Sequence, residues 1–251
     1  MRESHTRRVL VVNGKGGCGK STIATNLATA CANSGRTVVL MDYDAQASSS
    51  HWHQHRSANL AEVRLIEAHQ PSDMYVTRSF QTRIPPNTDD VIIDSPSGIR
   101  DVDIERLLRK TSAVIVPVLP SSIDIRAGAR FISKLLTHKA YRRKPIPVGV
   151  VANRVKPNTE CHAKLTHFLG CLDIPAIATF RDSQLYNRLA EQGLGLFDPS
   201  DSRSTKREMR EWQNLLQWLE PDSLARQKRN LSPQPLRQGP RTVGRSTSAH
   251  A

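Results

Sequence analysis

One glycine-rich segment, Gly14-Lys-Gly-Gly-Cys-Gly-Lys-Ser21, constrains the fold of this 251-residue chain more than any other feature. It matches the spacing G-x-x-x-x-G-K-[ST], and it lies between an apolar run, Val9 to Val12, and a segment of helical periodicity that begins near Ile23. Glycines allow positive φ angles, so the backbone N–H groups of such a loop can turn inward around phosphate oxygens where the helix begins. The segment therefore predicts a nucleoside triphosphate site.

Further short apolar runs recur along the chain, most of them separated by segments of helix length. They cover residues 37–41, 63–66, 91–93, 113–118, 146–152 and 176–180. Runs that are apolar on both faces are typical of buried parallel strands, and their alternation with helices favours right-handed crossovers. We expect an α/β fold with three layers, in which a mostly parallel sheet is flanked by helices.

The composition changes near Pro221. Before it, Met209, Trp212 and Leu216 belong to the apolar stripe of a helix that we expect to close the domain. From Pro221 onward the chain is rich in Pro, Ser, Gln and Gly and carries six basic residues and one acid. The sequence predicts one folded domain over residues 1–220 and a disordered basic tail over residues 221–251.

The charge balance indicates a polyanionic partner. Lys and Arg number 36 against 23 Asp and Glu, which gives a net charge of +13, and this excess favours nucleic acid or an anionic lipid surface. No apolar stretch is long enough to span a bilayer, and prolines such as Pro221 and Pro233 would interrupt an amphipathic targeting helix. We therefore expect a cytoplasmic protein that does not bind membranes.

Lys15 is the second informative feature of the loop, because an ordinary phosphate-binding loop does not require a lysine after its first glycine. With Lys15, the segment resembles the deviant Walker A box of the ParA/MinD ATPases, which are P-loop NTPases of SIMIBI-like fold. The resemblance implies that ATP is bound and that Lys15 crosses a dimer interface to the partner's nucleotide, while Lys20 reaches the β- and γ-phosphates. The expected nucleotide-binding loop residues are Gly14, Lys15, Gly16, Gly17, Cys18, Gly19, Lys20, Ser21 and Thr22.

Three carboxylates follow apolar runs and extend the resemblance. Asp42 and Asp44 lie in LMDYDAQ, which is similar to the second box of the family, and Asp94 lies in VIIDSPSG, which is similar to Walker B and the switch turn. By this resemblance Asp44 orients the attacking water, and Ser21, Asp42 and Asp94 surround Mg²⁺. Carboxylates at the carboxyl ends of parallel strands meet where ligands bind in such sheets. Each acid taken alone could instead cap a helix or belong to a turn.

The catalytic residues implied by these matches are Lys15, Lys20 and Asp44. Asn153, in VVANR, resembles the family asparagine that reads the adenine edge, and Arg181 lies in FRD, where the next loop of the family closes over the base. The alternative for Asn153 is a purely structural position in a loop. The resemblance covers about residues 8 to 219 and weakens toward the C-terminus.

ParA-like ATPases bind DNA without sequence preference as ATP-bound homodimers, and the resemblance implies the same nucleoid-associated behaviour here. The expected DNA contacts are Arg188, Lys206, Arg207 and Arg210, although these side chains could be solvated helix charges. A ParB-like or other adaptor would stimulate hydrolysis and release. The cargo could be a plasmid, a chromosome region or a protein cluster such as a carboxysome.

Two other functions stay open at this point. One is a P-loop enzyme that transfers phosphate to a small metabolic substrate, and Lys15 argues against it because such an enzyme does not need a second loop lysine. The other is a regulatory module that holds ATP without turnover, which the presence of both Asp44 and Asp94 disfavours.

Overall fold

The computed structural model describes residues 6–70, 82–200 and 202–231. Within them, seven strands form one sheet in the order β3-β2-β4-β1-β5-β6-β7, and all strand pairs are parallel. The strands are β1 (Arg7–Val11), β2 (Val38–Asp42), β3 (Val63–Glu67), β4 (Asp90–Asp94), β5 (Ala113–Val118), β6 (Val148–Val155) and β7 (Ala176–Arg181).

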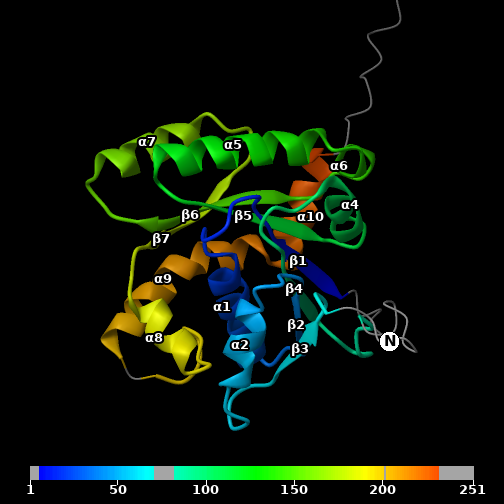
Figure 1. Ribbon diagram of the computed structural model, residues 1–251, viewed down its shortest axis with the longest axis vertical. Coiled ribbons are helices and arrows are strands. Elements are labelled where there is room, and N and C mark those ends of the chain that lie inside the picture. Colours follow the sequence, from blue (N-terminus) through cyan, green and yellow to red (C-terminus); the bar gives the residue numbers. More distant parts are fainter. Residues whose placement is uncertain (1–5, 71–81, 201, 232–251) are drawn as a thin grey trace, which may run out of the picture.

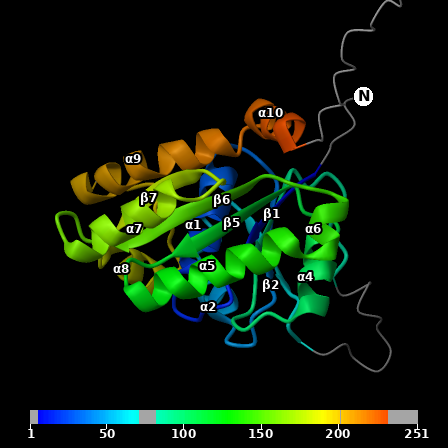
Figure 2. The ribbon, with the colours of Figure 1, turned by 90° about the horizontal axis from the view of Figure 1, so that it is seen from above.

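Helices cover both faces of this sheet (Figures 1 and 2). One face packs against α1 (Lys20–Asn33), α2 (Ser48–Gln54), α8 (Leu185–Glu191), α9 (Arg203–Trp218) and α10 (Pro221–Leu231). The other face packs against α4 (Asp101–Leu108), α5 (Ser122–Thr137), α6 (Lys139–Arg143) and α7 (Glu160–Gly170).

The central strands are buried on both faces because their side chains alternate between two hydrophobic cores. In β1, Val9 and Val11 lie in the core beneath α1, whereas Leu10 lies in the core beneath α5, and none of the three is more than 1% exposed. Continuous apolar runs are what such two-sided burial requires. The predicted three-layer α/β fold is confirmed.

The order of the strands places the glycine-rich loop at the middle of the sheet. Strand β1 pairs with β4 on one side and β5 on the other, so the chain leaves β1 at the point where the strand order reverses. In an open parallel sheet, ligands bind outside the carboxyl ends of the strands at such a point. Asp42 and Asp94 are register partners at the ends of β2 and β4, so both carboxylates reach this edge.

The tail prediction was wrong for its first part, because α10 occupies Pro221–Leu231. Proline is well tolerated in the first turn of a helix, where its missing N–H is not needed. Leu224 is 5% exposed and packs into the core beneath α9, which explains why this segment is ordered despite its polar composition. The rest of the predicted tail, residues 232–251, lies outside the described residues. Among the residues that the structure describes, we find no helix with the length and hydropathy of a bilayer span.

Candidate functional site

The glycine-rich loop joins β1 to α1 and has the backbone that its sequence requires. Gly17 and Gly19 have φ angles of 73° and 94°, in the left-handed region that side chains with a Cβ rarely adopt. A Cβ at Gly19 would also collide with the side-chain amide of Asn153. Gly19 precedes α1 without a side-chain cap, so the first N–H groups of the helix are left for a ligand.

The two lysines of the loop point to different places. Lys20 is only 5% exposed, and its Nζ donates a hydrogen bond of 3.2 Å to the carbonyl oxygen of Lys15 within the loop. Lys15 instead forms an ion pair with Asp124 in the first turn of α5, and its side chain is 37% exposed. Although burial opposes ionisation, Lys15 and the Ser121 hydroxyl lower the pKa of Asp124, which keeps the carboxylate charged.

The start of α2 is fixed to the ends of two strands by serine side chains. The Ser49 hydroxyl donates to Asp94 Oδ2 at 2.8 Å, and the backbone N–H and hydroxyl of Ser50 both donate to Asp42 Oδ2 at 2.9 Å. Both aspartates are fully buried. Asp42 therefore has a structural role, because it holds α2 against the sheet, and its predicted place around Mg²⁺ stays a prediction.

Asp94 has the features of a metal ligand. Its Oδ1 is buried and has no hydrogen-bond partner among the described residues. Burial raises the pKa of Asp94 to about 7, while the Ser21 and Ser49 hydroxyls act in the opposite direction. Magnesium prefers oxygen ligands such as one carboxylate together with phosphate oxygens. The residues fit Mg²⁺, and Ser21 and Asp94 are the side chains that would hold it.

Asp44 connects the loop after β2 with the turn after β4. Its Oδ2 accepts hydrogen bonds of 3.1 Å from both the backbone N–H and the hydroxyl of Ser97. Its own N–H donates to Asp42 Oδ1 at 3.0 Å. A partly exposed carboxylate that is held in this way at the phosphate end of the site can orient a water molecule.

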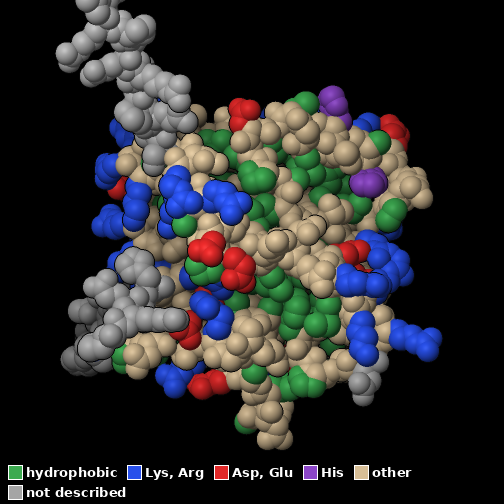
Figure 3. Space-filling model, turned by 180° about the vertical axis from the view of Figure 1, so that it is seen from behind, with side chains coloured by type: hydrophobic (Ala, Val, Ile, Leu, Met, Phe, Trp, Pro, Cys, Tyr) green, Lys and Arg blue, Asp and Glu red, His purple; other side chains and the backbone are tan. Residues whose placement is uncertain are grey.

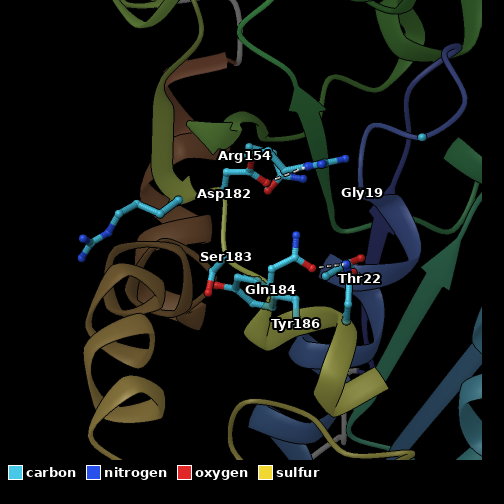
Figure 4. A pocket seen from close by; sticks show the side chains of 11 residues that line it. Gly19, Thr22, Arg154, Asp182, Ser183, Gln184 and Tyr186 are labelled. Atoms are coloured by element: carbon cyan, nitrogen blue, oxygen red, sulfur yellow. Dashed lines mark hydrogen bonds and ion pairs between the residues drawn. The ribbon is translucent and has the colours of Figure 1, made fainter. Parts of the chain in front are cut away.

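A pocket opens beside the loop, between the ends of β6 and β7 (Figure 4). Asn153 fixes its inner wall, because its Nδ2 donates to the Cys18 carbonyl at 2.8 Å and its Oδ1 accepts from the Arg154 N–H at 3.0 Å. Arg154 has a φ of 54°, and its guanidinium pairs with Asp182, which also lines the pocket. The lining residues are Gly17, Gly19, Thr22, Asn153, Arg154, Arg181, Asp182, Ser183, Gln184, Tyr186 and Asn187.

The structure thus brings Arg181 and Asn153 to one pocket next to the loop, as the sequence suggested. Both amide atoms of Asn153 already have partners within the chain. Its assignment to the adenine edge stays a prediction, as does the role of Arg181.

The basic residues proposed for DNA binding lie at one end of the molecule. Arg188 on α8 lines a hollow that is also lined by Ser202 and Thr205 at the start of α9, and Lys206, Arg207 and Arg210 are exposed on that helix. In Figure 3, Lys and Arg side chains gather at the right, over the first half of α9. No carboxylate in the part of the chain that the structure describes forms an ion pair with these four cations.

Sequence reasoning missed the side chains that support the predicted ones. These are Ser49, Ser50, Ser97 and Asp124. One of them had a signal in the sequence, because the spacing Ser121-x-x-Asp124 is typical of a helix start. The serines had none, since a serine near a strand end is common.

Comparison with known proteins gives a family match over most of the chain. Residues 9–194 match the CobQ/CobB/MinD/ParA nucleotide binding domain. Among characterised relatives, the maintenance of carboxysome distribution protein A of Halothiobacillus neapolitanus is 27% identical over 189 residues, which cover 74% of this chain and 85% of the relative.

Solved structures show the same fold. The septum site-determining protein MinD of Pyrococcus horikoshii, solved with Mg-ADP, has a TM-score of 0.62 at 18% identity, covering 89% of this chain and 98% of its own. McdA of Cyanothece, solved as an ATP complex, has a TM-score of 0.57 at 17% identity, covering 76% of this chain and 89% of its own. At these identities the likeness concerns the fold alone.

Proposed function

Because this chain belongs to the CobQ/CobB/MinD/ParA nucleotide-binding family, we propose that it is a ParA-type ATPase whose ATP-bound homodimer binds DNA without sequence preference and positions a cargo. The cargo would be a plasmid, a chromosome region or a protein cluster, and the similarity to a carboxysome distribution protein supports the last of these. A ParB-like or other adaptor would stimulate hydrolysis and release the DNA. The protein would then reside on the nucleoid in the cytoplasm.

The observation that carries this proposal is the position of Lys15. In a single subunit, Lys20 already places one ammonium group within the phosphate-binding loop. The ammonium group of Lys15 instead forms an ion pair with Asp124 of α5. Val102 and Ile123, at the starts of α4 and α5, are apolar and 67% exposed. Ile123 precedes Asp124, the partner of Lys15, so a partly exposed cation and an exposed apolar side chain meet at the start of α5, which supports an interface with a second copy to whose nucleotide Lys15 would be supplied.

The proposed hydrolysis depends on positioning and charge rather than on a covalent step. Lys20 would bind the phosphates. Ser21 and Asp94 would hold Mg²⁺, which would further neutralise the phosphate charge. Asp44, fixed by Ser97, would hold the attacking water. Lys15 of the partner would complete the stabilisation of the developing charge, so turnover would require the dimer.

The proposed DNA interface consists of the exposed cations of α8 and α9. Arg188, Lys206, Arg207 and Arg210 have no carboxylate partner in the described part of the chain, so they are available to phosphates. Contacts of this kind release counterions, and DNA affinity would therefore fall steeply with salt.

The experiment compares wild type, Lys15→Gln and a control, Lys139→Gln, whose lysine is exposed on α6. We expect ATP to convert wild type and the control into dimers that are retained on nonspecific DNA, while Lys15→Gln stays monomeric and unretained. Analytical ultracentrifugation and DNA retention with ATP or ADP provide the readouts. Two results would favour the small-substrate enzyme instead. One is wild-type protein that stays monomeric with ATP, and the other is wild-type protein whose ATP turnover does not respond to DNA and which ATP does not retain on DNA.

A further inference from the structure

The outer wall of the pocket in Figure 4 is a segment of the chain that runs from the end of β7 into α8. Of the residues that line the pocket, this segment supplies Arg181, Asp182, Ser183, Gln184, Tyr186 and Asn187. The phosphate-binding loop forms the opposite side through Gly17 and Gly19. A bound nucleoside triphosphate would therefore have its phosphates on one side of this space and its nucleoside against the segment 181–187.

One carboxylate on α9 holds the start of this wall. Glu211 accepts a hydrogen bond of 3.0 Å from the Arg181 backbone N–H through Oε2, and its Oε1 pairs with the Arg181 Nε at 2.5 Å. Both side chains are mostly buried, at 27% and 19% exposure. A carboxylate that binds the main chain and the guanidinium of one residue fixes the backbone position and the side-chain direction together.

The next residue of α9 holds the wall at a second point. Trp212 is fully buried, and its Nε1 donates a hydrogen bond of 3.0 Å to the Tyr186 hydroxyl. Its ring stacks on Phe180, with the ring centroids 4.5 Å apart. The segment that lines the nucleoside side of the pocket is thus attached to α9 at both of its ends, while nothing in these contacts touches the phosphate-binding loop.

We propose that Glu211 is a positioning residue for the nucleoside part of the nucleotide, and that it acts by holding Arg181 in the pocket wall. The proposal rests on the proposed function only in taking the ligand to be a nucleoside triphosphate. It has a structural consequence. Lys206, Arg207 and Arg210 precede Glu211 on the same helix, so the base pocket and the proposed DNA-binding surface share one rigid element.

An ion pair that only stabilises the fold would behave differently from a positioning pair. Loss of a purely structural contact would weaken all ligands of the site together, because the whole domain would loosen. Loss of a positioning contact would weaken only ligands that reach the wall. Inorganic tripolyphosphate separates the two cases, because it has the phosphates of ATP but no ribose or base.

The test measures the affinities of Mg·ATP and Mg·tripolyphosphate by competition against a fluorescent ATP analogue. The variant is Glu211→Gln, and the matched control is Glu220→Gln, whose side chain is exposed beyond the end of α9. We expect Glu211→Gln to weaken ATP about tenfold and tripolyphosphate less than twofold. The control should leave both affinities unchanged.

Arg181→Lys provides a second variant, which keeps the positive charge but removes the Nε donor. Arg181→Lys should reproduce the selective loss of ATP affinity. Combining it with Glu211→Gln should add little further loss, because both substitutions break the same contact between Arg181 Nε and Glu211. Equal losses for ATP and tripolyphosphate, or unchanged ATP affinity, would overturn the proposal. Tripolyphosphate that fails to compete in wild type would contradict it as well, and wild type that binds neither ligand would refute the proposed function itself.

Discussion

The two ends of the candidate site are built in different ways. At the phosphate end, Asp42 and Asp94 end β2 and β4, Asp44 follows β2, and the loop from β1 leads to Lys20 at the start of α1, so the strand order brings these residues together. At the nucleoside end, the wall depends on contacts between side chains from β7, α8 and α9. The first arrangement is fixed by strand order, whereas the second depends on tertiary packing that a single substitution can loosen.

The largest expected effect belongs to the phosphate end. Lys20→Ala removes the buried ammonium of the loop, and we expect ATP hydrolysis to fall about 10³-fold because the phosphate charge loses its main protein counterpart. Steady-state phosphate release measures the loss, with Lys139→Ala as a control. If Lys20→Ala lost less activity than Asn153→Ala or Glu211→Gln, the comparison between the two ends would be reversed.

Asp94 should make the nucleotide-free protein sensitive to pH. Burial raises its pKa from 3.8 to about 7, so the folded chain keeps a proton that the unfolded chain releases between these values. The free energy of unfolding therefore falls as the pH rises from about 4 to 7, by up to about 4 kcal/mol. Asp94→Asn should remove this contribution.

Thermal unfolding of wild type and Asp94→Asn at pH 5 and pH 8, without nucleotide or Mg²⁺, measures the difference. We expect the variant to gain stability relative to wild type at the higher pH. The exposed acid Asp222 on α10 provides a control through Asp222→Asn. Parallel pH profiles for wild type and Asp94→Asn would show that the carboxylate is already ionised in the folded chain.

Asp44→Asn should separate binding from hydrolysis within the phosphate end. The amide keeps the size of the side chain and one oxygen for Ser97, but it is a poor acceptor for the proton of an attacking water. We expect hydrolysis to fall about 10²-fold while ATP affinity changes little. Single-turnover hydrolysis and equilibrium binding are the two measurements. A parallel loss of affinity would mean that Asp44 supports the site only structurally.

The smallest effect is expected at the nucleoside end. Asn153→Ala removes the hydrogen bond to the Cys18 carbonyl, and we expect nucleotide affinity to fall about fivefold to tenfold. Asn214→Ala, at an exposed position of α9, is the control. Calorimetric titration with ATP gives the affinities. If ATP affinity fell about 10³-fold in Asn153→Ala, which is the loss expected for hydrolysis in Lys20→Ala, the two ends of the site would not be separable.

The same contrast explains what could be predicted from the sequence. Gly14 to Ser21 was recognisable because its glycine spacing acts locally, and Asp42 and Asp94 were recognisable because they end apolar strands. Asp124, which lies far from Lys15 in the sequence, could not be paired with it before the fold was known. Contacts of this kind depend on how helices pack on the sheet, and no local pattern encodes them.

Helix α10 shows a different limit of sequence analysis, because here composition predicted disorder where the structure has a helix. Its polar composition and Pro221 predicted disorder, yet Pro221 begins the helix and the buried Leu224 is enough to attach it to the core. Composition averages over a segment, whereas packing depends on where its few apolar residues lie. A boundary drawn from composition alone therefore excluded an element of the domain.

The central claim is that Lys15 acts on the nucleotide of a partner subunit, and mixing two inactive variants tests it most directly. In a mixed dimer of Lys15→Gln and Asp44→Asn chains, the site with an intact Asp44 would receive Lys15 from the other chain. We predict that an equimolar mixture hydrolyses ATP many times faster than either variant alone and reaches at most about half of the wild-type rate, because each mixed dimer has one complete site of two. A mixture as inactive as its separate components would contradict the account.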